Sequence, residues 1–193
     1  MRSVLIFSLV LSYVFITGQA EFPPELEDPG MVGKNKLFPH AYFIPFPDET
    51  AALTLVNEKS PLYMSLTGPW GFKYVENPID RPVDFYKEGY DVSGWDTLQV
   101  PANWELNGYC YPIYVNSDYE WTYHPEPPRV PHDYNPVGSY VKTFRLPKKW
   151  KKKRVFIHFG AVKSAFFIWV NGTRVGYSQG SKTPAEWEIT EFV

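Results

Sequence analysis

The segment that decides the fold is AFFIWVNGTRVGYS, residues 165–178, which contains two apolar stretches joined by Asn171-Gly172. A two-residue turn of type I′ needs positive φ at both positions, and Asn-Gly is the dipeptide that meets this need most often. The flanking stretches are rich in aromatic and β-branched residues, which favour strands. The sequence therefore predicts a β-hairpin at residues 165–178.

Similar short segments recur along the chain and are separated by Gly, Pro, Asn and Asp. Strands are predicted at residues 62–66, 70–75, 97–100, 139–146 and 155–159, and residues 80–90 are the one place where a short helix is expected. Residues 21–60 are expected to form an extended, Pro-rich arm, because proline excludes helix interiors and central strands. The pattern predicts an all-β, antiparallel sandwich over residues 61–193.

Length and composition support a globular β-protein. The 193 residues are 44% hydrophobic, 18% aromatic and 21% charged, with a net charge of −2 and 19 prolines. These values argue against a helical bundle, a collagen and a disordered tail. The chain is too short for a catalytic (β/α)₈ barrel, which needs roughly 250 residues. Cys110 is the only cysteine, so an intrachain disulfide is impossible, and we expect a small buried residue there.

The first 20 residues have the features of a secretory signal peptide. Arg2 precedes an apolar run from Val4 to Ile16, and small residues stand at Gly18 and Ala20. The run is shorter than the roughly 20 residues that span a bilayer. The sequence predicts a secreted, extracellular product with no membrane association after signal cleavage. An anchor that is never cut is the alternative.

Six of the 19 basic residues lie in the run KKWKKKR, residues 148–154. Such a run can mark a nucleic-acid, heparin or nuclear-import site. Because it falls between two predicted strands, we expect a solvated hairpin tip with Trp150 packed beneath it, and no nucleic-acid partner.

Three patterns suggest catalysis and fail on context. Residues 176–180 match G-x-S-x-G, but the serine lies on a predicted hairpin strand rather than a strand-to-helix turn, and no histidine follows. The four histidines, at 40, 124, 132 and 158, lack metal-site spacing. Glu186 and Glu188 would share one strand face, whereas glycosidases place two carboxyl groups on opposite sides of the substrate. We expect surface or salt-bridged carboxylates there.

From about residue 28 to residue 193 the sequence resembles the N-terminal sugar-binding domain of family 2 glycoside hydrolases, and most closely that of the long β-galactosidases. The motifs that carry the resemblance are NKLFPHA (35–41), LTGPWGFKY (66–74), VPANWELNGY (100–109), PIYVN (112–116), NPVGSY (135–140), VNGTRVGYSQ (170–179) and SKTPAE (181–186). Their order covers nearly the whole chain after the signal.

The resemblance implies a jelly-roll, galactose-binding-domain-like β-sandwich. It also implies that both catalytic glutamates lie on a barrel in missing C-terminal domains, so this chain is expected to be a truncated, inactive fragment of a β-galactosidase-like hydrolase. No catalytic residue, metal site or cofactor is expected in it, although some family enzymes use Mg²⁺ and a monovalent cation. A stand-alone, lectin-like module that binds galactosides is the alternative, and a purely structural scaffold is a third.

By position, Asn116 matches the family asparagine that reaches the galactosyl hydroxyls, and an amide is suited to this because it offers both donors and an acceptor. Residues 179–181 match another segment of the pocket rim, where Gly180 replaces an aspartate that some relatives use to contact the sugar and a cation. Trp121 is a candidate stacking platform, although a buried tryptophan is the commoner outcome. Asn171-Gly172-Thr173 is a candidate N-glycosylation site at Asn171.

Overall fold

The hairpin around Asn171 forms as the sequence predicts. The structure is a computed structural model that describes residues 21–116, 119 and 122–193. Strands β6 (Ala165–Val170) and β7 (Thr173–Gln179) pair antiparallel, with a register irregularity between Ile168 and Trp169. Asn171 has φ 47° and Gly172 has φ 79°, so both turn residues take the positive values that the dipeptide favours.

A second antiparallel sheet faces this hairpin. Strand β2 (Gly68–Val75) lies at its centre, between β3 (Asp96–Val100) and β4 (Val137–Val141). Phe72 in the middle of β2 is fully buried, and its ring contacts Tyr140 and Tyr109 with centroids 4.7 and 4.8 Å apart. An aromatic cluster therefore forms the interior of this layer.

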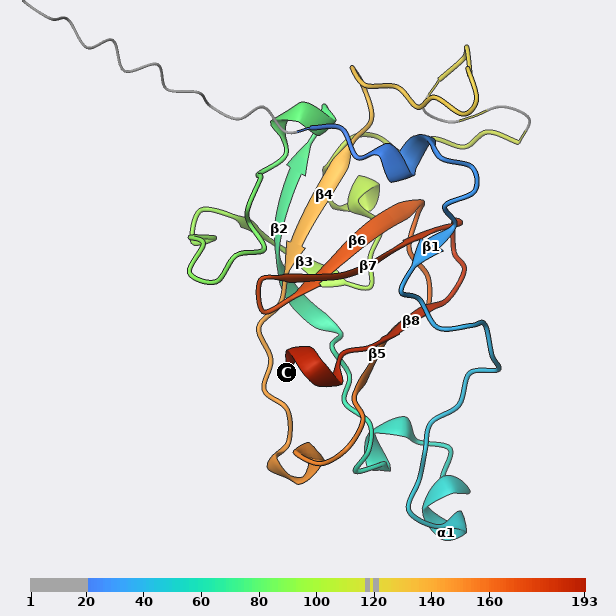
Figure 1. Ribbon diagram of the computed structural model, residues 1–193, viewed down its shortest axis with the longest axis vertical. Helices are drawn as coiled ribbons and strands as arrows, with labels where there is room; N and C mark the ends of the chain where they lie inside the picture. The colour runs from blue at the N-terminus through green and yellow to red at the C-terminus, as the bar shows by residue number, and fades with distance from the viewer. Residues whose placement is uncertain (1–20, 117–118, 120–121) are drawn as a thin grey trace, which may run out of the picture.

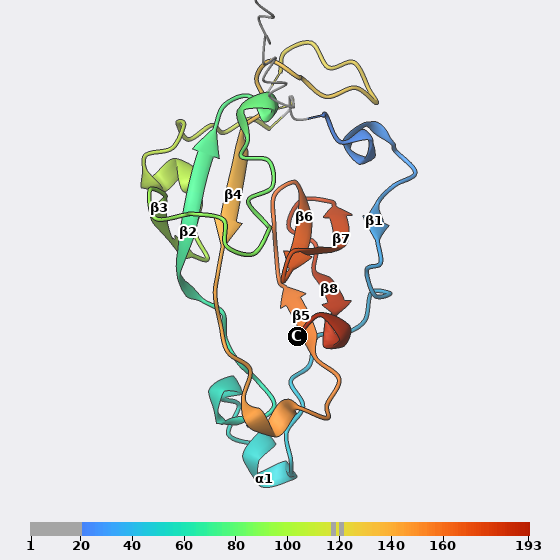
Figure 2. The ribbon, with the colours of Figure 1, turned by 60° about the vertical axis from the view of Figure 1, so that its left-hand side comes forward.

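Strands β5 (Phe156–Phe159) and β8 (Ala185–Glu188) pair antiparallel beside the β6–β7 hairpin, and together these four strands make the layer opposite β2, β3 and β4 (Figures 1 and 2). The buried apolar cluster of this layer consists of Val155, Ile168, Val170, Val175, Ala185, Trp187 and Ile189. Trp187 is the largest fully buried side chain of the described chain.

The arm, residues 21–60, is mostly irregular and lies along the sandwich. Its strand β1 (Gly33–Lys34) adds to the edge of β7, and the indole Nε1 of Trp187 donates a 3.0 Å hydrogen bond to the Lys34 carbonyl. The helix α1 (Glu49–Ala52) is capped by the Asp48 carboxylate, which accepts from the Ala51 N–H at 2.8 Å. The 3₁₀ helices are Pro24–Glu27, Asn57–Lys59, Pro78–Asp80, Trp104–Asn107, Lys148–Trp150 and Thr190–Phe192.

The all-β, antiparallel class is confirmed, and several local predictions are wrong. Residues 80–90 form turns instead of a helix, residues 62–66 pair with no strand of the described chain, and the strand expected at 139–146 is Val137–Val141. Cys110 is half-buried with φ 62°, and its Sγ lies 3.2 Å from the Tyr134 hydroxyl. The signal segment lies outside the described residues, and none of the helices described is long and apolar enough to cross a membrane.

Candidate functional site

Asn116 lies in an exposed bend of the long connection between β3 and β4. Its side-chain amide makes no hydrogen bond to any residue that the structure describes. Trp121, the predicted stacking residue, lies outside the described residues.

The segment at residues 179–181 follows directly from β7. Gln179 Oε1 accepts a 2.9 Å hydrogen bond from the Tyr177 hydroxyl, and the Gly180 N–H donates to the Ser164 carbonyl at 3.1 Å. Gly180 has φ 111°, and a Cβ built there would lie 3.1 Å from Thr183 Oγ1. Since side chains are strained at this φ, the backbone here favours glycine.

A cleft of about 3100 Å³ is lined by residues of both layers, of the arm and of the connecting loops, among them Gln179, Gly180 and Ser181. Asn116 does not line it. The volume exceeds the roughly 300–1000 Å³ of a small-molecule pocket. The cleft is therefore not a pocket shaped for one sugar, and it does not bring the two predicted rim segments together.

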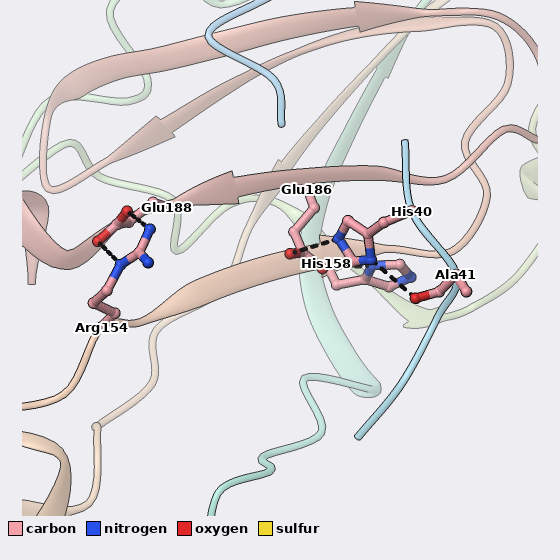
Figure 3. A network of polar contacts seen from close by, with 6 residues as sticks. All are labelled: His40, Ala41, Arg154, His158, Glu186 and Glu188. Atoms are coloured by element: carbon pink, nitrogen blue, oxygen red, sulfur yellow. Dashed lines mark hydrogen bonds and ion pairs between the residues drawn. The ribbon is translucent and has the colours of Figure 1, made fainter. Parts of the chain in front are cut away.

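A polar network that sequence reasoning missed lies on the outer face of β5 and β8 (Figure 3). The Glu186 carboxylate lies between two imidazoles: Oε1 is 3.3 Å from Nε2 of His40 on the arm, and Oε2 is 3.1 Å from Nδ1 of His158 on β5. His40 Nδ1 lies 2.9 Å from the Ala41 carbonyl. The hydrogen bonds of His40 raise its pKa above its ordinary value. The bond to the Ala41 carbonyl has the larger effect and the bond to Glu186 the smaller one.

Glu188, two residues further along β8, forms an ion pair at the other end of the same face (Figure 3). Arg154 Nε donates to Oε1 at 3.0 Å and Nη2 donates to Oε2 at 2.6 Å, while the Thr190 hydroxyl donates to Oε1 at 2.8 Å. The hydrogen bonds from Arg154 and Thr190 lower the pKa of Glu188 to about 2. A general acid needs a pKa near the working pH, so Glu188 is not suited to that role, and the predicted salt-bridged carboxylates are confirmed.

Two further carboxylates fasten the start of the arm. Glu27 Oε1 lies 2.8 Å from His132 Nε2 and accepts from the Val130 N–H at 3.2 Å, and Phe22 stacks on the His132 ring at 3.9 Å between centroids. Glu25 accepts a 2.6 Å hydrogen bond from Arg174 on β7. Together with the Glu186 network, these contacts fix the arm to the sandwich at its start and near its middle.

The His40–Glu186 contact predicts a pH-dependent stability. Because the folded-state pKa of His40 is raised above its ordinary 6.5, its stabilisation is complete below pH 6.5 and is lost as the pH rises through the folded-state value. The urea midpoint is expected to be higher at pH 5.5 than at pH 8, and His40→Gln is expected to reduce this difference. His124→Gln, which replaces a histidine away from the arm contacts, is the control; an equal reduction there would contradict the assignment.

Asn171, the predicted glycosylation site, is exposed, and its side-chain Nδ2 donates a 2.7 Å hydrogen bond to the Phe192 carbonyl. Modification of this amide would have to break that bond, so glycosylation of Asn171 stays a prediction. Within residues 21–116, 119 and 122–193, no group of three or more His, Cys, Asp and Glu side chains gathers into a metal site.

Comparisons with known proteins place the chain in a family. Residues 63–193 match the family described as glycosyl hydrolases family 2, sugar binding domain. The chain is 40% identical over 174 residues to a β-galactosidase of Priestia megaterium, covering 89% of this chain and 17% of that protein. It is 35% identical to the β-galactosidase large subunit of Leuconostoc lactis, covering 87% of this chain and 28% of that subunit.

Among solved structures, a β-glucuronidase from Bacteroides uniformis aligns with a TM-score of 0.48 at 22% identity, covering 67% of this chain and 13% of that one. This chain spans about a sixth of the length of the Priestia β-galactosidase. The match to the family 2 sugar-binding domain covers about two thirds of the residues of this chain. The chain therefore belongs to glycoside hydrolase family 2, as a sugar-binding domain of that family.

Proposed function

We propose that this chain is the sugar-recognition module of a secreted β-galactosidase-like hydrolase. In this proposal the loop that carries Asn116 binds β-galactosides, and the glycosidic bond is cleaved by catalytic domains that this chain does not include. The observation that carries the proposal is the 40% identity to a β-galactosidase over 89% of this chain. Secretion rests on the signal-like composition of residues 1–20.

The surroundings of Glu186 and Glu188 support a role in sugar binding rather than in bond cleavage. Glu186 is held between His40 and His158, and Glu188 is held by Arg154 and Thr190. Both extend from the same face of β8, as alternate residues of a strand do. A retaining glycosidase needs two carboxyl groups about 5 Å apart that flank the substrate. Glu186 contacts imidazoles of the arm and of β5, and Glu188 contacts Arg154 and Thr190, an arrangement that suits a binding module.

Asn116 supplies the recognition chemistry in this proposal. Its amide offers two donors and one acceptor, which match adjacent sugar hydroxyls, and the bend exposes it. A sugar bound by a few hydrogen bonds on an open loop is expected to bind weakly, with a dissociation constant on the order of 1 mM.

Asn116→Ala is expected to weaken lactose binding about tenfold, because a hydrogen bond to a neutral partner contributes about 1 kcal/mol and the amide makes more than one. The measurement is a lactose titration of the ¹⁵N-labelled chain followed by NMR. Asn57→Ala, at the end of the molecule that carries α1, is the matched control and should leave the affinity unchanged. If Asn116→Ala and the parent chain bind lactose with equal affinity, Asn116 does not contact the sugar.

A further inference from the structure

The basic run at residues 148–154 forms a hydrogen-bonded turn between β4 and β5. Lys148–Trp150 is a 3₁₀ helix. The Trp150 N–H donates to the Pro147 carbonyl at 2.8 Å, and the Lys153 N–H donates to the Trp150 carbonyl at the same distance. All six basic side chains of the run are exposed. The turn therefore presents its cations from a defined backbone.

Trp150 anchors this turn from below. Its ring packs against the buried cluster around Trp187, and its Nε1 donates a 2.9 Å hydrogen bond to the Pro61 carbonyl. The predicted packing of Trp150 beneath the turn is confirmed, but the predicted hairpin is wrong, because β4 and β5 belong to different sheets and the turn connects the two layers. Both ribbon views place the turn at the end of the molecule that carries α1, away from the end where residues 122–135 lie (Figures 1 and 2).

The charges of the turn are largely uncompensated. Arg154 pairs with Glu188, which leaves Lys148, Lys149, Lys151, Lys152 and Lys153. None of these five lysines has a carboxylate oxygen within 4.0 Å in the described part of the chain. What distinguishes the turn is the clustering of its lysines, because five of the six residues 148–153 are lysine. Five adjacent unpaired ammonium groups are suited to a partner with several regularly spaced anions.

We propose that this lysine turn binds a sulfated polysaccharide, at a site separate from the galactoside-binding loop. Sulfate groups along a polysaccharide are fixed anions whose condensed counterions are released when lysines replace them, as happens with other linear polyanions. Basic runs of this length are typical of heparin-binding segments.

The orientation of Trp150 favours this partner over single-stranded nucleic acid. Binding of single-stranded nucleic acid relies on aromatic rings on which bases stack, and the aromatic ring of this turn faces the core. A polysaccharide that binds through its sulfates needs no exposed ring, and duplex DNA and anionic vesicles are the competing polyanions in the test below.

The test measures binding of heparin to the chain by calorimetry at several salt concentrations. Lys149→Gln with Lys152→Gln is expected to weaken binding about tenfold and to make the slope of log K against log salt shallower by about 1.5. The matched control is Lys34→Gln with Lys73→Gln, which removes the same charge from exposed lysines on β1 and β2 and should change binding less than twofold.

Three results would overturn the proposal: no heparin binding by the parent chain, equal losses in the two double variants, or tighter binding to duplex DNA or to phosphatidylglycerol vesicles than to heparin. The lactose titration of the Lys149/Lys152 variant is expected to match that of the parent chain. A loss of lactose binding in that variant would show that the two sites are not separate. Failure of the galactoside proposal alone would leave the heparin result unchanged.

Discussion

Trp187→Ala is expected to destabilise the chain by about 3–5 kcal/mol, the cost of truncating a large buried aromatic residue. Trp187 is 0% exposed and lies at the centre of the apolar cluster. The rings of Phe159 and Phe166 meet it edge-on, with centroids 6.0 and 5.5 Å away. The melting temperature is expected to fall by roughly 6–20 °C, since 1 kcal/mol corresponds to about 2–4 °C for a chain of this size.

Trp187→Phe separates the packing contribution from the hydrogen bond. Phenylalanine keeps most of the apolar contact but leaves the Lys34 carbonyl without the Nε1 donor. The expected loss is about 1–3 kcal/mol, and backbone amides of β1 should exchange hydrogen faster. A loss in the alanine variant no larger than that in the phenylalanine variant would contradict the central role of the ring in the core.

Gly176→Ala is expected to be nearly as damaging, with a loss of about 3 kcal/mol, at the upper end for an overpacked interior. Gly176 lies on β7, where a Cβ would collide with the Trp187 indole nitrogen and with the Lys34 carbonyl oxygen. Since the latter is backbone, β1 must move away from β7 to make room. Guanidinium unfolding monitored by tryptophan fluorescence measures the loss.

Gly94→Ala is the matched control for Gly176→Ala. A Cβ at Gly94 meets no atom within 4 Å, and its φ lies outside the left-handed region. The same chemical change there is expected to alter stability by less than about 0.5 kcal/mol. A similar loss in both variants would mean that close approach of β1 and Trp187 at Gly176 is not the cause.

Local signals in the sequence account for the strands that form. Asn171-Gly172 meets a strict backbone requirement, so the β6–β7 hairpin could be predicted from two residues. The helix expected at residues 80–90 fails for an equally local reason: Pro82 lacks an N–H, and Asp84 and Gly89 take positive φ. Residues 62–66 show a different limit, because an apolar pattern indicates burial but does not name a partner strand.

The polar network around Glu186 could not be predicted from sequence. His40 and Glu186 are 146 residues apart, and neither lies in a motif that specifies the other. Their contact arises because the arm runs across β8, which depends on tertiary packing. By contrast, the shared face of Glu186 and Glu188 was predictable, since residues i and i+2 of a strand extend to the same side.

The central claim is that this chain recognises β-galactosides and leaves their hydrolysis to another part of the enzyme. The most direct test is one NMR experiment in which the ¹⁵N-labelled chain is mixed with lactose and both protein and sugar signals are followed for a day. The account predicts saturable shifts of amides in the Asn116 loop, while the lactose signals stay intact. Release of free galactose and glucose by a pure preparation, or lactose titration without any amide shift, would contradict it.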